Sequence, residues 1–494
     1  MRLAELAVAA GLHLHEGADV PVTGFAIDHR KVELGNVFGA FEGKAVNGED
    51  FIAEAVNAGA VAVVARPGVQ VDRAIHIGDD NPRRAFAHLA AAYFKPVPDL
   101  VVAVTGTNGK TSTAELARQI WAMAGEQSAS IGTLGVTANG RTIETGLTTP
   151  DIVTFLTNMN ALAREGVTHA AYEASSHGLS QYRNEGIRVA AGAFTNLSRD
   201  HLDYHENMDA YFAAKMRLFD EVVADNGAAV IWADDDWSAR AIEQAERRGL
   251  RIVTIGKKGG AIRLLSCTPG QLGQSLEIEY HGVWRKLHLP LIGAYQAANA
   301  LIAAGLVLST GGAADETFDA LLRLSPVRGR LECAVVSRVG APLFVDYAHS
   351  PDALEAALDA LGPHARGQLI VVFGAGGDRD KGKRAEMGRV AVRSADYVIV
   401  TDDNPRGEDA ASIRTMVLEG CGSGDNVREI GDRRDAIAAA IARAGADDVI
   451  LVAGKGHEQG QIIGSGEDKL VLPFDDVAVA KELVRAQGEQ AHEC

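Results

Sequence analysis

The sequence predicts an α/β protein made of three domains. Its 494 residues exceed what one hydrophobic core supports, and this length favours about three domains. After the first hundred residues, short apolar runs alternate with helical patterns, which is typical of doubly wound parallel sheets. Two stiff or short connecting segments, Lys95–Pro98 and Pro326–Arg330, divide the chain. We predict a small α/β domain at residues 1–98, a central P-loop domain with a doubly wound sheet at 99–328, and a C-terminal Rossmann-like open α/β sheet at 329–494.

Composition narrows the class of protein. Apolar residues make up 47% and charged residues 23%, as in ordinary globular proteins. A net charge of −17 disfavours a nucleic-acid partner, because such a partner requires a basic face. The four cysteines have no paired spacing, which favours a reducing compartment, the cytoplasm, over a disulfide framework or a zinc ribbon. The uncharged stretch Leu287–Ala314 is long enough to cross a bilayer, but Pro290 and Gly293 interrupt it and favour a strand followed by a buried helix from about residue 294 to 308.

The first domain is predicted from short apolar runs between turn glycines. Glu5 lies where a signal peptide would be apolar, so residues 1–10 are predicted to form an amphipathic helix that ends at Gly11. Strand candidates are residues 25–28, 37–41, 61–65 and 74–77. The loops at Asp28–Val32 and Gly43–Gly48 carry polar and basic side chains, which suit either solvated turns or contact with a nucleotide-sugar.

The central domain begins with a strand, a loop and a helix. The apolar run Leu100–Val104 is followed by Thr105–Thr111, and then by a helical pattern. Glycines let backbone N–H groups face a phosphate chain, Lys110 adds a charge, and the hydroxyl of Thr111 can bind magnesium. ATP is therefore the expected ligand, although Val104 stands where the general P-loop motif has glycine.

Later strands are predicted to end in polar clusters. Residues 167–174 deliver Glu173 at a carboxyl end, where it suits magnesium. Residues 189–195 precede Asn196, Asp200, His201, Asp203 and His205, and a helix carrying Lys215 follows. His201 and His205 have zinc-ligand spacing if helical, but two histidines without a ligand are favoured. Further strands are predicted at 228–233, 251–256, 276–280 with 283–289 as a hairpin, 342–346, 368–373, 397–401 and 449–453, and a helix carries Asn299.

The C-terminal domain presents three polar loops at one sheet edge. Ser350 and Pro351 are explained as a helix start, whereas Asp346 and His349 are not. The loops Gly374–Arg384, Asp403–Arg406 and Gly454–Glu458 each follow a strand. Their arginines and lysines suit anionic carboxylates, and the first loop lacks the spacing of a dinucleotide-binding motif.

The run Thr105–Thr111 resembles the ATP-binding motif of the Mur ligase family, the ATP-dependent amide-forming enzymes of peptidoglycan precursor synthesis. Further matching motifs run in order from Asp28 to Glu458. The resemblance implies that the first domain binds a UDP-sugar, the second ATP and the third an amino acid. It departs at His29, where the family usually has serine, and at Lys44–Val46.

The resemblance assigns roles to particular residues. The implied catalytic residues are Lys110, Glu173, His201 and Lys215, and the implied magnesium ligands are Thr111, Glu173, His201 and Lys215 as its carbamate (N6-carboxylysine). The implied ATP-binding residues are Gly106, Thr107, Asn108, Gly109, Lys110, Thr111, Ser112, Asn299, Arg330, Asp346 and His349. Those implied for the UDP-sugar substrate are Ile27, His29, Thr148, Thr149, Ser175, Gln181 and Arg183. Those implied for diaminopimelate are Arg379, Asp403, Asn404, Pro405, Arg406, Gly454 and Glu458.

The expected activity follows from these assignments. The resemblance implies a cytoplasmic, monomeric enzyme that uses ATP and Mg²⁺ to join meso-diaminopimelate to UDP-N-acetylmuramoyl-L-alanyl-D-glutamate through an acyl phosphate. Arg406 favours diaminopimelate because a guanidinium binds the second carboxylate that lysine lacks. The alternatives are the lysine-adding ligase of the same family and, from another class, a P-loop ATPase or binding module.

Overall fold

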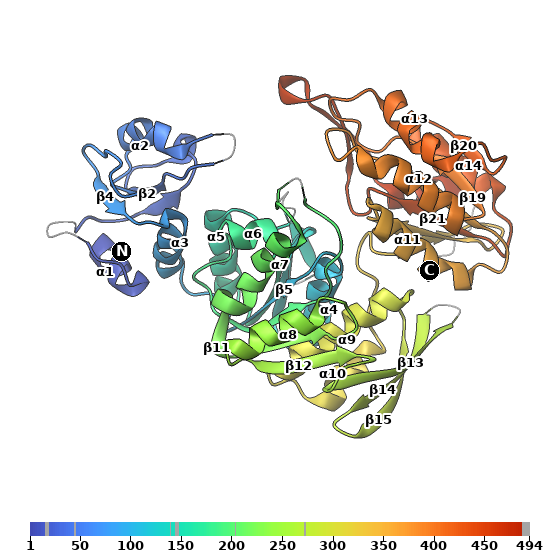
Figure 1. The fold of residues 1–494 in the computed structure, drawn as a ribbon, viewed down its shortest axis with the longest axis horizontal. Helices are drawn as coiled ribbons and strands as arrows, with labels where there is room; N and C mark the ends of the chain where they lie inside the picture. The colour runs from blue at the N-terminus through green and yellow to red at the C-terminus, as the bar shows by residue number, and fades with distance from the viewer. Residues whose placement is uncertain are drawn as a thin grey trace. The chain divides into compact units, whose positions relative to one another are not determined.

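The structure is a computed structural model that describes residues 1–14, 19–43, 46–138, 140–143, 148–202, 204–270 and 273–486. Its contacts divide the chain into two compact units, Met1–Thr254 with Gly305–Ala313, and Ile255–Ala304 with Ala314–Cys494. Strand β12 (Arg251–Gly256) and helix α9 (Ala294–Ser309) contribute to both units. Parallel sheets flanked by helices confirm the predicted α/β class (Figure 1). The domain boundaries at residues 98 and 328 stay a prediction.

The first unit begins with a four-stranded parallel sheet in the order β1-β2-β3-β4. Successive residues of β2 and β3 point to opposite faces of this sheet, and both faces are buried. Val37 and Val64 pack in one cluster with Phe86 of α3, whereas Phe38 and Val63 pack in another with α2. Gly11 ends α1 in the left-handed conformation, as predicted. The bounds are α1 Leu3–Ala10, β1 Gly24–Ala26, β2 Asn36–Gly39, α2 Ile52–Ala58, β3 Ala62–Ala65, β4 Ile75–Gly78 and α3 Pro82–Tyr93.

The central sheet of the first unit has the order β11-β10-β5-β9-β6-β7-β8. Strand β5 pairs with parallel strands on both sides and is almost fully buried, which explains its continuous apolar run. The antiparallel strands β7 and β8 were not predicted, since they are short and partly or wholly exposed. The bounds are β5 Leu100–Thr105, α4 Lys110–Met123, β6 Ser128–Gly132, β7 Gly135–Ala138, β8 Arg141–Ile143, α5 Ile152–Arg164, β9 His169–Glu173, α6 Ser176–Ser180, β10 Val189–Phe194, α7 Met208–Arg217, β11 Val223–Trp232 and α8 Ser238–Arg247.

The second unit contains an antiparallel meander, β13 (Ile262–Gly270), β14 (Gly273–Tyr280) and β15 (Val283–Leu289). The predicted hairpin across His281 and Gly282 is confirmed. Helix α9 confirms the helix expected from the uncharged stretch, and α10 (Ala314–Leu321) follows it. Within the described residues, none of the helices combines the length and apolarity that a membrane crossing needs.

The C-terminal sheet of the second unit has the order β16-β17-β21-β18-β19-β20. All its neighbouring pairs are parallel except β16 with β17. Helices α11, α12 and α13 share one cluster with one face of the sheet, and α14 and α15 share another with the opposite face. The four predicted strands are confirmed as β17, β18, β19 and β21. The bounds are β16 Glu332–Val336, β17 Pro342–Asp346, α11 Pro351–Leu361, β18 Leu369–Phe373, α12 Gly382–Ser394, β19 Tyr397–Val400, α13 Ala410–Cys421, β20 Val427–Glu429, α14 Arg433–Arg443, β21 Val449–Ala453, β22 Gly460–Ile463, β23 Leu470–Pro473 and α15 Asp476–Ala486.

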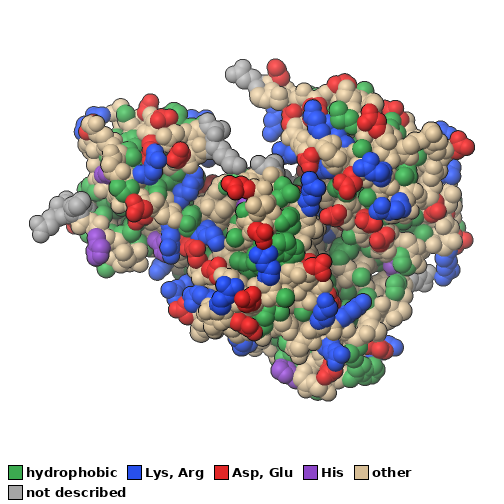
Figure 2. All heavy atoms as spheres, viewed as in Figure 1, with side chains coloured by type: hydrophobic (Ala, Val, Ile, Leu, Met, Phe, Trp, Pro, Cys, Tyr) green, Lys and Arg blue, Asp and Glu red, His purple; other side chains and the backbone are tan. Residues whose placement is uncertain are grey.

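Acidic and basic side chains are interspersed over the face seen in Figure 2. Among the cysteines that the structure describes, Cys267 and Cys421 are free, whereas Cys333 takes part in a disulfide bond. The spacing of the cysteines predicts no disulfide framework, and Cys333 departs from that prediction.

Candidate active site

The loop between β5 and α4 has the shape of a phosphate-binding loop. Gly106 has φ +144°, and a Cβ there would lie 1.9 Å from the Thr195 hydroxyl, so no larger residue fits. Gly109 has φ +86° and caps α4, whose first residue is Lys110. Backbone N–H groups at this helix start carry the positive end of the helix dipole. The loop therefore offers an anion site at the carboxyl end of the central strand.

Two lysines converge on one carbonyl oxygen of this loop. Lys110 Nζ donates to the carbonyl oxygens of Gly106 at 2.9 Å and Thr107 at 2.7 Å. Lys215 of α7 is only 1% exposed, and its Nζ donates to the same Gly106 oxygen at 2.6 Å. Burial, with the Lys110 charge beside it, holds the pKa of Lys215 well below its ordinary value. A lowered pKa increases the fraction of uncharged amine, and only the uncharged amine can react with carbon dioxide.

The end of β10 holds the loop in place. The backbone N–H of Thr107 donates to the carbonyl oxygen of Asn196, and the backbone N–H of Asn108 donates to the side-chain oxygen of Asn196, both at 2.9 Å. The Thr195 hydroxyl donates to the Asn108 carbonyl at 2.6 Å. Tyr211 of α7 lies within 3.3 Å of the Thr107 hydroxyl and stacks its ring 4.4 Å from Lys215 Nζ. Sequence reasoning missed Thr195 and Tyr211, because only the fold brings them to the loop.

Glu173 and Thr111 provide oxygen atoms beside the loop. Glu173 is 2% exposed at the end of β9, and Thr133 donates to its two oxygens from the backbone N–H at 2.6 Å and from the hydroxyl at 3.2 Å. Glu173 and Thr111 line one small cavity. Carboxylate and hydroxyl oxygens are the hard ligands that magnesium prefers, so this pair fits the ion.

His201 lies in a cluster of rings, with Asp200 Oδ2 3.6 Å from its Nε2. Its ring is 4.9 Å from that of His177 and 6.0 Å from that of Tyr211, and its own φ is +54°. His205 packs against the same two rings. Asp203, between them in the sequence, lies outside the described residues. The described chain holds no group of three or more His, Cys, Asp or Glu side chains that could bind a metal, so the zinc alternative gains no support. The role of His201 as a magnesium ligand stays a prediction.

The residues expected to bind the UDP-sugar substrate form a hydrogen-bonded group. The Thr149 hydroxyl donates to Ser175 Oγ at 2.9 Å, and Arg183 Nη1 donates to the Thr149 carbonyl at 2.9 Å. Arg183 also holds the side-chain oxygen of Gln181 with two N–H groups. The Thr148 and Thr133 hydroxyl oxygens lie 3.0 Å apart, which connects this group to Glu173. Five side chains that are up to 35 residues apart in the chain thus share one network.

The first sheet carries the other two residues of this set. Ile27 follows β1 and is 36% exposed, and His29 begins the short helix after it. The His29 ring is stacked on Phe51 with centroids 4.3 Å apart. Lys44 and Ala45, where the chain departs from the family, lie outside the described residues, whereas Val46 is exposed.

The residues expected to reach ATP from the second unit are joined to one another. Asn299 Nδ2 donates to Gln296 Oε1 at 3.0 Å, and Gln296 Nε2 donates to the Arg330 carbonyl at 3.0 Å. Asp346 accepts the backbone N–H groups of residues 331 and 348, both at 2.8 Å. Burial raises the pKa of Asp346, and the Arg330 guanidinium opposes that shift. Ser350 caps α11 as predicted, and His349 Nδ1 lies 2.8 Å from the carbonyl oxygen of Tyr347, whose ring lies under Arg330.

The three C-terminal loops meet at one edge of the sheet, as predicted. Asn404 Nδ2 donates to Glu458 Oε2 at 2.7 Å, and Lys455, in the same loop as Glu458, donates to Asn404 Oδ1 at 2.8 Å. Arg406 Nη1 donates to the Gly377 carbonyl at 2.9 Å, which brings the first loop beside the second. A Cβ on Gly454 would lie 2.5 Å from an Asp403 oxygen, which explains the glycine. The set is completed by Pro405, which follows Asn404, and by the exposed Arg379. Burial, and then Asp403, raise the pKa of Glu458.

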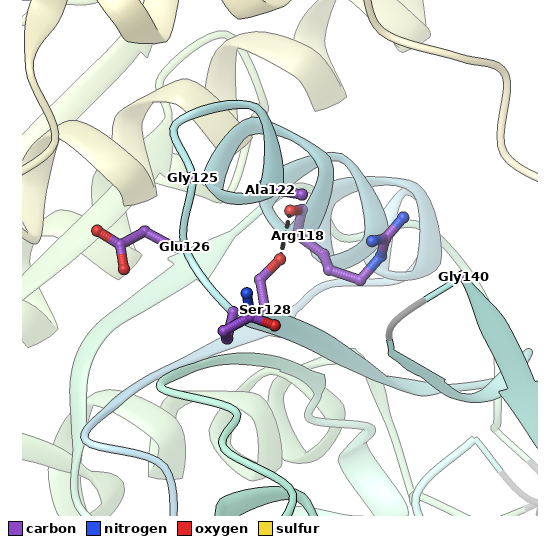
Figure 3. Close-up of a pocket in the computed structure, with 7 residues that line it drawn as sticks. Arg118, Ala122, Gly125, Glu126, Ser128 and Gly140 are labelled. Atoms are coloured by element: carbon purple, nitrogen blue, oxygen red, sulfur yellow. Dashed lines mark hydrogen bonds between the residues drawn. The ribbon is translucent and has the colours of Figure 1, made fainter.

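A further hollow in the first unit lies away from the loop. It is at the opposite end of α4, between Arg118, Gly125, Ser128 and Gly140 (Figure 3). Ser128 Oγ donates to the Arg118 carbonyl at 2.9 Å, and the Arg118 guanidinium is paired with Glu115. Ser128 and Arg118 thus have hydrogen-bond or ion-pair partners within the chain, and none of the residues that line the hollow is one of the predicted site residues.

The first unit holds a phosphate-binding loop between a buried strand and a helix, and the second α/β unit holds a cluster of acidic and basic loops; together they define a P-loop nucleotide-dependent enzyme. The chain belongs to the Mur ligase family: the Mur ligase middle domain matches residues 104–307, and the Mur ligase glutamate ligase domain matches residues 329–456.

Similar proteins agree over nearly the whole chain. A protein of Zymomonas mobilis named UDP-N-acetylmuramoyl-L-alanyl-D-glutamate--2,6-diaminopimelate ligase is 57% identical over 98% of this chain and 99% of its own. A protein of the same name from Bradyrhizobium diazoefficiens is 51% identical over 93% of this chain and 94% of its own. A solved structure of a ligase of that name is 31% identical and has a TM-score of 0.73; the match covers 99% of this chain and 100% of the solved one. The MurF ligase of Thermotoga maritima in complex with ADP has a TM-score of 0.61 at 19% identity. The match covers 94% of this chain and 99% of the MurF chain, so the two proteins share the fold.

Proposed function

We propose that this protein is an ATP-dependent ligase that adds meso-diaminopimelate to UDP-N-acetylmuramoyl-L-alanyl-D-glutamate, a step of peptidoglycan precursor synthesis. Relatives of that name match the chain from end to end, at up to 57% identity among those given above. The structural observation that carries the proposal is the meeting of Asn404, Arg406 and Glu458 at one sheet edge, on loops tied by hydrogen bonds. A P-loop ATPase or binding module needs no such cluster, and the family match argues against it.

The reaction must activate a carboxylate, because an ionised carboxylate is a poor electrophile for an amine. The γ-phosphoryl group of ATP is transferred to the D-glutamate carboxylate, which gives an acyl phosphate and ADP. The amine of the incoming amino acid attacks the acyl carbon, and phosphate leaves as the amide forms. Lys110 at the loop would bind the transferred phosphoryl group and neutralise its charge.

Magnesium would be held by Thr111 and Glu173, which line one cavity, with His201 and the Lys215 carbamate as the further ligands that the family resemblance implies. When bound, it would supply positive charge to the phosphate oxygens. A carbamate nitrogen retains one N–H, so modified Lys215 can keep its bond to the Gly106 carbonyl. The modification would change a cation into an anion beside a metal.

Substrate choice would depend on two sets of side chains. The network of Thr149, Ser175 and Arg183, with Ile27 and His29 on the first sheet, would hold the UDP-sugar dipeptide. At the other set, Arg406 would bind the carboxylate at the far end of diaminopimelate, and Glu458 would accept the neighbouring ammonium. Lysine lacks that carboxylate, so the guanidinium would disfavour it. We also propose that the reaction occurs in the cytoplasm, where ATP is available, and that the protein is a monomer.

The test is phosphate release by the purified protein with each substrate omitted in turn, and with a panel of amino acids. The proposal expects release only when ATP, UDP-sugar dipeptide and meso-diaminopimelate are all present, with the amide product confirmed by mass spectrometry. Release with ATP alone would identify an ATPase. Equal use of L-lysine would identify the lysine-adding activity.

A further inference from the structure

Lys455 is a fully buried lysine directly below the candidate amino-acid site. It follows β21, and its side chain is 0% exposed, whereas the side chain of Glu458, three residues on, is 30% exposed. Lysine is almost never fully buried unless it has a partner. Glycines on both sides of it have positive φ, +117° and +56°, which lets the chain turn its side chain inward.

The contacts of Lys455 determine which way the Asn404 amide points. Lys455 Nζ and the backbone N–H of Ile462 both donate to one atom of this amide, at 2.8 and 2.9 Å. Because two donors meet there, that atom must be the oxygen, and both its lone pairs are used. The amide nitrogen is therefore turned toward Glu458 Oε2, to which it donates at 2.7 Å.

The charge of Lys455 also balances the acids around it. Asp403, Glu458 and Asp476 lie near it, with Arg433 as a second buried cation. Arg433 is committed to Asp476 through two bonds of 2.7 Å. The Lys455 ammonium lies 3.8 Å from Glu458 Oε2 and therefore favours the ionised form of the Glu458 carboxylate. The nearby Arg406 acts in the same direction, whereas the negative charge of Asp403 opposes ionisation.

We propose that Lys455 is a positioning residue for the amino-acid substrate: it fixes the Asn404 amide and keeps the Glu458 carboxylate ionised and aimed at the substrate's ammonium group. Lys455 itself lies beneath these groups and does not touch the substrate. The inference rests on the proposed function, since it assigns the site an α-amino-acid head group that offers an ammonium to Glu458.

The test compares Lys455→Met, which keeps the length of the side chain but removes the charge and the donor, with wild type. The KM for meso-diaminopimelate is expected to rise roughly ten- to a hundredfold, the usual effect of losing a hydrogen bond to a charged group. The KM values for ATP and for the UDP-sugar dipeptide should stay within about twofold. The acid limb of the pH profile of kcat/KM for diaminopimelate should move to higher pH, because Glu458 without the ammonium gains a proton more easily.

Controls separate positioning from general damage. The exposed Lys469→Met should leave all three KM values unchanged. In a Glu458→Gln background, Lys455→Met should cost less than in wild type, because the carboxylate that it serves is gone. If Lys455→Met does not fold, Lys455→Gln is measured instead; it keeps a donor for Asn404 but removes the charge, so its criterion is the shift of the acid limb to higher pH.

An unchanged KM and pH profile in the folded variant would overturn the inference, as would an equal rise in all three KM values. Either result leaves the proposed function standing, because wild type still forms the amide. Failure of wild type to use diaminopimelate at all would instead count against the proposed function.

Discussion

Lys215 offers the sharpest test of the loop chemistry. The Nζ atoms of Lys215 and Lys110 both bond to the Gly106 oxygen, at 2.6 and 2.9 Å, so a charged Lys215 would lie within about 5.5 Å of the Lys110 ammonium. At an effective dielectric constant near 20, two like charges at that distance repel by about 3 kcal/mol. A carbamate on Lys215 turns this into an attraction of similar size. We expect Lys215→Met, which cannot form the carbamate, to lower kcat by roughly a hundredfold to a thousandfold.

The assay is ligation in buffers stripped of carbon dioxide. Wild-type activity should fall and return when bicarbonate is added, whereas Lys215→Met should not respond. Lys215→Ala should be inactive and partly rescued by a short-chain carboxylic acid, which replaces the missing carboxylate. Full activity of an enzyme whose intact mass lacks one carbon dioxide would refute the reasoning.

Four further outcomes are expected. Lys110→Ala should lower kcat by ~100- to 1,000-fold while circular dichroism shows an intact fold, and near-normal turnover would remove Lys110 from the mechanism. Arg406→Ala should reduce kcat/KM for meso-diaminopimelate by roughly ten- to a hundredfold, and an unchanged preference over L-lysine would contradict the assignment. Arg433→Met leaves Asp476 buried without its partner, and the free energy of unfolding from denaturant titration should fall by ~3–5 kcal/mol. A decrease below about 1 kcal/mol would mean that this ion pair contributes no more to stability than an exposed ion pair does. Burial lowers the pKa of His457 to about 3, so between pH ~6.5 and about 3 only the unfolded chain binds a proton at this residue. The free energy of unfolding should therefore decrease as the pH is lowered through this range, by up to about 1.4 kcal/mol per pH unit. His457→Gln should make this decrease smaller, and an unchanged pH dependence in the variant would exclude His457 as its cause.

The sequence was most informative where structure is local. Strand β5, its glycine loop and the start of α4 lie within a dozen residues, and the chemistry of each is visible in the order of residue types. The hairpin at His281 and the capped start of α11 are local in the same sense. The apolar runs also predicted the parallel strands of the C-terminal sheet, since strands buried on both faces need them.

What the sequence did not reveal depends on long-range contacts. Thr133 reaches Glu173 across 40 residues, and Lys455 reaches Asn404 across 51. Tyr211 is 104 residues from Thr107 and has no motif of its own. Strands β7, β8 and β13 were missed because exposed or edge strands carry weak apolar patterns. The position of Lys215 at the loop was implied by family resemblance alone, since a helical lysine is ordinarily a solvated one.

The two loop carbonyls that hold Lys110 also bear on how the product phosphate departs. If Lys110 binds the transferred phosphoryl group, as proposed, its ammonium loses that partner in a partly buried site, and the lack of another hydrogen-bond acceptor would slow the departure of phosphate. Here the replacement acceptors at residues 106 and 107 are three to four residues away and already within 2.9 Å. The loop would therefore return to a satisfied state as phosphate leaves, which favours a short product residence time.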